Sequence, residues 1–297
     1  MNIVRISAGL GNQMFQYALY LSLREVNPDI VIDISEFKYR KHHQGYELEE
    51  IFNITPDVAS ESEVATMVDT SKSFIAEIRR KLFGKRNLSG NHLKESDFDY
   101  MAGLDKLTNT YFEGYWQSYR YFEDIEQIVR EQFSFKKPLT ERNRECATKI
   151  EATESVSIHI RRGDYTKSRR WHNIGSICNS DYYNWAMASI NASIPDAVYF
   201  VFSDDIQWVR ENLNIPNATY IDWNVGAASH NDLRLMSLCK HNIIANSSFS
   251  WWGAYLNNNE DKIVIAPSKW YRDTPTPNLL PPSWVTIPID NSVNLKK

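Results

Sequence analysis

Cysteine is scarce in this chain of 297 residues, which contains only Cys146, Cys178 and Cys239. The three lie far apart, their number is odd, and no C-x-x-C pair occurs, so their spacing supports neither a zinc site nor a disulfide framework. Unpaired cysteines are typical of proteins that work in a reducing compartment. The scarcity of cysteine therefore predicts a cytoplasmic protein.

Long hydrophobic runs are also absent. No stretch approaches the ~20 apolar residues that span a bilayer. The start of the chain, MNIVRISAGLGNQ, lacks the basic segment followed by a long apolar segment that marks a signal peptide. Together these absences predict a soluble protein whose contact with a membrane is at most peripheral.

An excess of positive charge is missing as well. The formal net charge is -4 and the pI is near 6.0, whereas a dedicated nucleic-acid-binding protein usually carries a basic stripe. The basic stretch IRRKLFGKR, residues 78–86, is interpreted as a solvated face, with an acidic surface such as a membrane as the alternative partner. Aromatic residues are plentiful at 13%, and they either fill the core or line a carbohydrate-binding surface.

The order of the expected elements indicates an α/β fold. A strand at 2–7 leads through AGLGNQ into a segment of helical periodicity, and a second strand follows at 29–35. A further series of alternating strands and helices occupies 155–267, which is typical of a doubly wound parallel sheet. We predict two Rossmann-like domains that face a cleft, residues 1–150 and residues 151–297.

Polar clusters follow four of the expected strands, at the point where each strand ends. These clusters are AGLGNQ, RRGDY, SDD and NSSFS. Parallel α/β sheets bind ligands beyond the carboxyl ends of their strands. Four such clusters therefore indicate a ligand site rather than coincidence.

The first cluster combines a tight turn with two carboxamides. Gly9 and Gly11 permit the close approach of backbone to a ligand, and the helix that follows attracts an anion at its N-terminus. A nicotinamide-cofactor fingerprint requires a third glycine where Met14 stands, which disfavours a dehydrogenase. A purely structural turn remains an alternative for the glycines, but it does not explain Asn12 and Gln13.

The cluster HIRRGDY places two arginines directly after a strand. Arginine is suited to bidentate contact with phosphate and stays charged in any environment. Because side chains alternate along a strand, His159 and Arg161 share one side and Arg162 points away. We expect Arg161 to meet a ligand and Arg162 to brace the structure through Asp164. The alternative is a purely structural network of arginines and aspartates.

The remaining two clusters offer oxygen atoms. The acids of SDD suit a metal over a diphosphate, recognition of guanine through its N–H groups, or a helix N-cap, and we favour guanine recognition. In NSSFSWW, Ser247, Ser248 and Ser250 stand where a helix begins, which favours an oxyanion ligand, while Trp251 and Trp252 are expected in the core. No nucleophile motif occurs. The clusters together indicate a diphosphate nucleotide held by arginine and helix N-termini, without a metal.

The motifs GLGNQMFQYA, GYELEEIFNI, EGYWQSYRYF, SIHIRRGDY, VFSDD and NSSFSWWGAYL jointly resemble the bacterial alpha-1,2-fucosyltransferases of glycosyltransferase family 11. The likeness runs from Arg5 to about Trp284. It implies a GT-B type fold, GDP-β-L-fucose as the donor, and inversion at the fucose anomeric carbon without a metal or other cofactor. The implied acceptor is the 2-hydroxyl of a terminal galactose. The first motif departs from the family at Ala8, where many members carry glycine.

The resemblance implies roles in donor binding for eight residues. Arg161 is similar to the arginine that grips the β-phosphate, and His159 and Asp205 to contacts of guanine. The phosphates are also contacted by Ser248 and by the backbone of Phe249, with Ser247 adjacent. From the N-terminal domain, the residues that face the diphosphate and the fucose are Gly11 and Asn12.

The general base is assigned to Asp164, which together with Arg161 forms the predicted catalytic pair. The alternatives in the N-terminal domain, which we expect to carry the acceptor, are Asp33, Glu36, His42 and His43. A base that accepts the proton of the acceptor hydroxyl contributes about 10²- to 10⁴-fold to the rate.

The predicted function is thus the transfer of fucose to galactose-terminated oligosaccharides in the synthesis of bacterial O-antigen or capsule. Lipid-linked acceptors of this kind would place the enzyme at the inner face of the inner membrane. The alternatives are a related glycosyltransferase with a different nucleotide sugar and a non-catalytic module that binds nucleotide sugars. Nucleic acid is not an expected partner.

Overall fold

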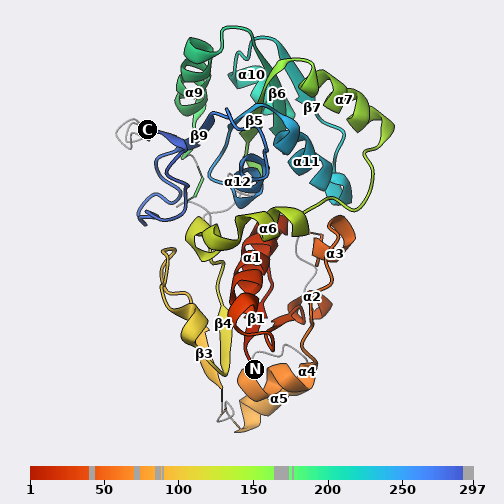
Figure 1. Ribbon diagram of the computed structural model, residues 1–297, viewed down its shortest axis with the longest axis vertical. Coiled ribbons are helices and arrows are strands. Elements are labelled where there is room, and N and C mark those ends of the chain that lie inside the picture. The colour runs from red at the N-terminus through yellow and green to blue at the C-terminus, as the bar shows by residue number, and fades with distance from the viewer. Residues whose placement is uncertain are drawn as a thin grey trace. The chain divides into compact units, whose positions relative to one another are not determined.

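The computed structural model describes residues 1–39, 44–69, 74–83, 88, 90–163, 174–175 and 177–289, with residues 74–76 described by their backbone alone. The chain divides into two compact units, Met1–Lys137 and Pro138–Lys297 (Figure 1). The helix α7 (Glu141–Glu151) belongs to the second unit because it packs on β5 and α11 of that unit. The units therefore meet between Lys137 and Pro138, whereas we predicted a boundary after residue 150, a position inside α7.

Unit 1 contains a parallel sheet of four strands in the order β2-β1-β4-β3. The strands are β1 (Ile3–Arg5), β2 (Val31–Asp33), β3 (Asn91–Lys94) and β4 (Thr110–Glu113). The helices are α1 (Leu10–Val26), α2 (Glu36–Tyr39), α3 (Leu48–Ile51), α4 (Glu61–Met67), α5 (Phe74–Phe83) and α6 (Glu126–Gln132), with the 3-10 turns η1 (Leu104–Lys106), η2 (Tyr119–Tyr121) and η3 (Glu123–Ile125).

The long helix α1 is the centre of unit 1. Most of its side chains are buried, among them Met14, Phe15 and Leu19, so it lies in the core rather than on the surface. It ends at Val26 because Asn27 leaves the helical conformation ahead of Pro28, which disfavours helix in the residue before it. The strand-turn-helix-strand start of the chain is confirmed.

Unit 2 contains a parallel sheet of six strands in the order β10-β9-β8-β5-β6-β7. Its strands are β5 (Glu154–Ile160), β6 (Ala197–Ser203), β7 (Ala218–Ile221), β8 (His241–Ile243), β9 (Val264–Pro267) and β10 (Val285–Ile287). Its helices are α7, α9 (Ser180–Ser193), α10 (Ile206–Asn212), α11 (His230–Leu238) and α12 (Ser248–Tyr255), with the 3-10 turn η5 (Gly226–Ala228).

Helices cover both faces of the second sheet. On one face, Val156, Ile158 and Ile160 of β5 pack against buried residues of α9 and α10. On the other face, α7, α11 and α12 pack on one another and on the sheet. With both faces covered, β6 is almost continuously apolar. In β5, Val156, Ile158 and Ile160 alternate with polar residues, and the strand is buried from Ser155 to Ile160. Both patterns made these strands predictable. The predicted α/β class with parallel sheets is confirmed.

Three strands were not predicted from the sequence. The strands β3 and β4 contain four residues each and β10 contains three, and β3 is largely exposed. The exposed strand β3, with the sequence NHLK, has no apolar pattern that would reveal it. Among the described helices, none has the length and apolar composition needed to cross a bilayer.

Candidate functional site

The strand order of unit 2 places the predicted site residues at one position of the sheet. From β5 the chain moves outward to β6 and β7, and it then returns to the other side of β5 with β8, β9 and β10. The order therefore reverses between β5 and β8, and ligands of open α/β sheets bind beyond the strand ends at such a switch point. His159 and Arg161 stand at the end of β5, and Ser247 and Ser248 follow β8.

Two ion pairs join the end of β5 to the end of β6. The Nη1 of Arg161 lies 2.9 Å from Oδ2 of Asp204, and the backbone N–H of Arg162 donates to Oδ1 of the same carboxylate at 2.9 Å. Arg162 lies 3.6 Å from a carboxylate oxygen of Asp205, and its guanidinium stacks 3.5 Å from the ring centre of Trp208. Arg162 is thus held by Asp205 and Trp208, in line with its predicted structural role. The partner predicted for it, Asp164, lies outside the described residues.

Asp204 pairs with Arg161, although of the two acids in SDD only Asp205 was predicted as a site residue. A side chain at Gly163 would place its Cβ 2.4 Å from Oδ2 of Asp204, so only glycine allows this approach. The neighbouring Asp205, predicted to contact guanine, caps α10 by accepting from the N–H of Trp208 at 3.1 Å. One feature of the sequence could have indicated Asp204: this acid comes directly after the apolar strand β6, where ligand contacts are expected.

His159 is a buried imidazole that faces α12. Its side chain is largely enclosed, its ring lies 5.8 Å from that of Phe249, and its Nδ1 has no hydrogen-bond partner in the described part of the chain. Burial, with the charge of Arg161 as the second cause, lowers the pKa of His159 to about 4. The ring is therefore neutral at pH 7, and its Nδ1 lies buried without a hydrogen-bond partner among the described residues.

The first turn of α12 presents hydroxyl and N–H groups at the end of β8. Ser247 is the N-cap residue, but its hydroxyl makes no capping hydrogen bond to the helix. Ser250 instead donates to the carbonyls of Ala245 and Ser247, at 3.4 and 3.2 Å, so its hydroxyl supports the turn itself. Ser247 and Ser248 therefore remain the serines of this motif that suit an oxyanion.

Unit 1 has a switch point of its own, between β1 and β4. The helix α1 begins after β1 with Gly9 as its N-cap residue, and the segment after β4 returns beside it. The Nε2 of Gln117 donates to Oδ1 of Asn12 at 2.6 Å and so connects the two strand ends. Gly11 and Asn12 thus lie at the position expected for a ligand contact. Gln117 was not assigned from the sequence.

The second carboxamide of the first motif has a structural role. Gln13 is fully buried, donates to the carbonyls of Ala8 at 2.9 Å and Gly45 at 2.8 Å, and accepts from the N–H of Glu47 at 3.0 Å. It therefore fixes the segment before α3 against the turn of α1. These hydrogen bonds explain the second carboxamide of the motif, because Gln13 has a structural role and needs no contact with a ligand.

Two of the candidate general bases are already engaged. Asp33 is buried and accepts from the hydroxyl of Tyr111 at 2.7 Å and from the N–H of Ser35 at 2.8 Å. Glu36 forms an ion pair with Arg5. Asp164, His42 and His43 lie outside the described residues. Asp33 and Glu36 therefore already have partners within unit 1, and Asp164 stays a prediction.

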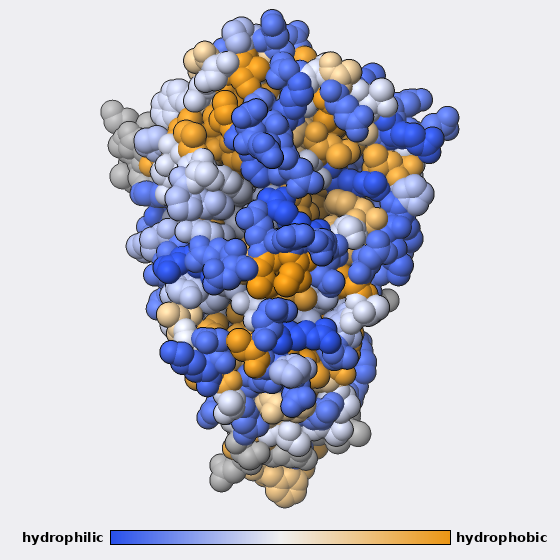
Figure 2. All heavy atoms as spheres, viewed as in Figure 1, coloured by the Kyte–Doolittle hydropathy of each residue, from blue (hydrophilic) through white to orange (hydrophobic). Residues whose placement is uncertain are grey.

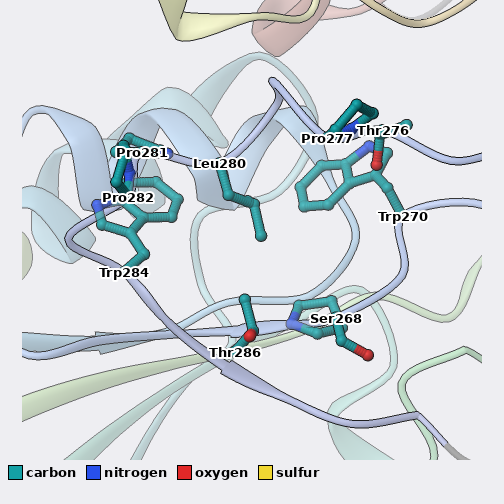
Figure 3. A pocket seen from close by; sticks show the side chains of 10 residues that line it. Ser268, Trp270, Thr276, Pro277, Leu280, Pro281, Pro282, Trp284 and Thr286 are labelled. Carbon is teal, nitrogen blue, oxygen red and sulfur yellow. The ribbon is translucent and has the colours of Figure 1, made fainter.

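A cavity of about 330 Å³ lies at the far edge of the second sheet, beside β9 and β10 (Figure 3). Leu280 points into it between Trp270 and Trp284, and Ser268 and Thr286 line it from the side of the strands. No charged side chain is among its lining residues, so it does not suit a diphosphate. The strand β8 lies between β9, which borders the cavity, and β5, which carries the arginine cluster.

Within the ranges that the structure describes, no three side chains of His, Cys, Asp or Glu gather as a metal site would require. The groups that suit a phosphate in unit 2 are instead a guanidinium, two hydroxyls and the N–H groups of a helix start.

The sequence pattern of the family "Glycosyl transferase family 11" matches residues 1–287. This chain is a member of glycosyltransferase family 11. The predicted family is thereby confirmed. The arginine and serine clusters therefore belong to a glycosyltransferase.

Relatives within the family include bacterial and animal enzymes. The chain is 33% identical to "Alpha-1,2-colitosyltransferase" of Escherichia coli, over 91% of this chain and 92% of that protein. It is 32% identical to "O-antigen biosynthesis glycosyltransferase WbnK" of Escherichia coli, over 95% and 99%. It is 26% identical to "Galactoside alpha-(1,2)-fucosyltransferase 1" of Lagothrix lagotricha, over 95% and 73%.

Among solved structures, the fold is similar to that of NodZ alpha-1,6-fucosyltransferase soaked with GDP-fucose. The TM-score is 0.50 at 13% sequence identity, and the match covers 86% of this chain and 91% of that one. At this identity the likeness concerns the fold alone. The family 11 chain thus has the GT-B type α/β fold that we predicted.

Proposed function

We propose that this family 11 glycosyltransferase transfers L-fucose from GDP-β-L-fucose to the 2-hydroxyl of a terminal galactose, with inversion and without a metal. The observation that carries the proposal is the cluster at the switch point of unit 2. There Arg161, the unpaired nitrogen of His159 and the serine-bearing start of α12 meet at adjacent strand ends. Unit 2 would bind the donor, and unit 1 the acceptor.

The proposed reaction is a direct displacement. The acceptor oxygen attacks C1 of fucose, the bond from C1 to the β-phosphate oxygen breaks, and the hydroxyl proton passes to a base, for which Asp164 remains the candidate. The leaving GDP gains negative charge as that bond breaks. Arg161 and the N–H groups of α12 stabilise this charge where it develops, so they act on the transition state more than on the bound donor.

The neutral imidazole of His159 and the neighbouring ring of Phe249, tilted by 45° against it, support binding of a nucleotide base. A charged histidine would repel Arg161, whereas the neutral ring allows the arginine to hold the phosphate. Asp204 pairs with Arg161 and would orient its guanidinium for bidentate contact.

The product of the reaction would be a fucosylated, galactose-terminated glycan of a bacterial surface polysaccharide. The relative named for O-antigen biosynthesis supports this assignment. A lipid-linked acceptor would place the enzyme in the cytoplasm at the inner face of the inner membrane.

The test combines one arginine substitution with a matched control. We expect Arg161→Ala to lower the rate of fucose transfer to a β-galactoside by about 10²- to 10³-fold, because it removes stabilisation of the leaving diphosphate. Arg142→Ala is the control, because Arg142 is an exposed arginine that pairs at 3.7 Å with Asp222 and stacks on Trp223. Folded Arg161→Ala protein with near-normal turnover would contradict the proposal, as would a wild-type rate that vanishes when a chelator is added.

The second candidate donor is a colitose nucleotide, because the bacterial relative at 33% identity is named a colitosyltransferase. Both sugars would use the same phosphate contacts, so Arg161 does not distinguish them. Mass spectrometry of the products from a panel of nucleotide sugars, each supplied with the same galactoside, decides between them.

A further inference from the structure

The helix α5 of unit 1 exposes large apolar side chains next to cations. Leu82 is 69% exposed, Phe83 81% and Ile78 40%, so all three are exposed large hydrophobic residues, and Phe83 and Leu82 are among the most exposed in the described chain. Ile78 and Leu82 stand four positions apart and so share one face of the helix, with the exposed Lys81 beside them. Figure 1 shows α5 next to α4, and Figure 2 shows hydrophobic atoms exposed in that part of unit 1.

Two ion pairs hold α5 in this position. Asp69 pairs with Arg79, and it also pairs with Arg80 at 3.2 Å, while Arg80 donates to the backbone carbonyl of Asp69 at 3.3 Å. Both arginine side chains keep about a fifth of their surface exposed. These contacts fix α5 in a position in which Leu82 and Phe83, at its C-terminal end, are exposed. The single carboxylate of Asp69 serves both guanidinium groups.

The charge of this stretch is opposite to that of the whole chain. Residues 74–86 contain five lysines and arginines and one glutamate, although the protein as a whole carries a net charge of -4. Apolar residues flanked by lysine and arginine are the pattern of a helix that lies at the surface of a bilayer. Anionic lipids attract an exposed cation such as Lys81 by about 1 kcal/mol near the membrane surface.

We propose that Ile78, Lys81, Leu82 and Phe83 form a docking surface for a membrane that contains anionic lipid. A protein partner is the weaker occupant, because three apolar side chains do not approach the ~800 Å² that each partner buries in a stable interface. This inference rests on the proposed function in one respect. If the acceptor is lipid-linked, the enzyme has to reach it at the membrane, and the docking surface would bring it there. The docking surface does not depend on which sugar is transferred.

The experiment uses the full chain and large vesicles of phosphatidylcholine with or without phosphatidylglycerol. We expect the wild type to sediment with the phosphatidylglycerol vesicles, to bind pure phosphatidylcholine weakly, and to dissociate as salt is raised. The double variant Leu82→Ser and Phe83→Ser should lose about tenfold in partition coefficient. The control removes two exposed valines elsewhere, Val26→Ser and Val225→Ser, which are 60% and 74% exposed, and should bind as the wild type does.

Equal binding of the wild type and the Leu82, Phe83 double variant overturns the proposal, as does wild-type binding that ignores phosphatidylglycerol. Transfer to a soluble galactoside is measured in the same preparations, and we expect all three proteins to be equally active there. If the Leu82, Phe83 double variant loses vesicle binding but keeps its transfer activity, the docking surface is supported. If the wild type shows no transfer, the proposed function is contradicted, and the vesicle experiment still tests the docking surface independently.

Discussion

Ala8 carries a backbone conformation that suits glycine. Its φ is 64°, in the left-handed region, where a Cβ costs roughly 1–2 kcal/mol. The same position is the one at which the first motif departs from many family members by having alanine. The turn that presents Gly11 and Asn12 is therefore strained in this chain.

We expect Ala8→Gly to raise the free energy of unfolding by about 0.5–1 kcal/mol, since relief of strain exceeds the added freedom of the unfolded chain. Urea denaturation measures the change. The control, Ala147→Gly in the middle of α7, should lower it by about 1 kcal/mol because glycine is a poor helix former. Destabilisation by both substitutions would show that the turn is not strained.

Asp232, at the start of α11, has an unusual protonation behaviour. Burial raises its pKa from 3.8 to about 7, and a hydrogen bond from Asn224 at 2.8 Å opposes this only in part. The folded protein therefore keeps the proton over a range in which the unfolded chain loses it. The free energy of unfolding should fall as the pH rises from about 4 to about 7.

We expect Asp232→Asn to remove this part of the pH dependence and to be more stable than the wild type at pH 8, by on the order of 2 kcal/mol. Thermal or urea unfolding at several pH values measures it. Asp222→Asn, on an exposed side chain of the same unit, should leave the profile unchanged. A parallel shift of the whole profile in Asp232→Asn would point to packing rather than titration.

At the scale of elements, the segment after β4 depends on a carboxylate from the end of β3. Glu95 accepts from the N–H of Tyr115 at 2.6 Å and from that of Trp116 at 3.1 Å. Trp116 is fully buried with a φ of 56°, which few large residues adopt. Glu95 therefore stabilises a strained turn whose next residue, Gln117, reaches Asn12.

We expect Glu95→Ala to lower the free energy of unfolding by about 2 kcal/mol, because two backbone N–H groups lose their acceptor. Glu95→Gln keeps one acceptor oxygen and should cost less than half as much. Chemical denaturation compares the two variants with the wild type. Similar losses in both would mean that the charge, rather than the hydrogen bonds, stabilises the turn.

At the scale of the whole molecule, the division into two units predicts where the nucleotide acts. His159, Arg161, Ser247 and Ser248 all belong to unit 2. Saturating GDP should therefore slow amide hydrogen exchange in β5, β6, β8 and the start of α12, and much less in β2 and β3 of unit 1. At a hundredfold excess over Kd the ligand adds about 2.7 kcal/mol of stability.

Exchange measured by mass spectrometry, with and without a chelator, checks this expectation. Arg161→Ala should weaken the protection at equal GDP concentration, and Arg142→Ala should not. Protection confined to unit 1, or protection that needs an added divalent cation, would contradict the assignment of the donor to unit 2 and its proposed metal independence.

Local information determined much of this protein. Patterns of neighbouring residues sufficed for the α/β class and for the candidates His159, Arg161, Ser247 and Ser248. These patterns are the alternating apolar residues of β5, the apolar run of β6, the turn before α1 and the clusters that follow four strands. They sufficed because strand burial, helix starts and the chemistry of arginine act over a few residues.

Contacts between distant residues were decided only by the tertiary structure. Which strand ends lie side by side depends on the strand order, and this order pairs Arg161 with Asp204 and Asn12 with Gln117 across many residues of chain. The same packing assigned Gln13 and Asp205 to structural contacts, although their residue types suit a ligand equally well. A side chain's chemistry is local, but its partner is set by the packing of the whole unit.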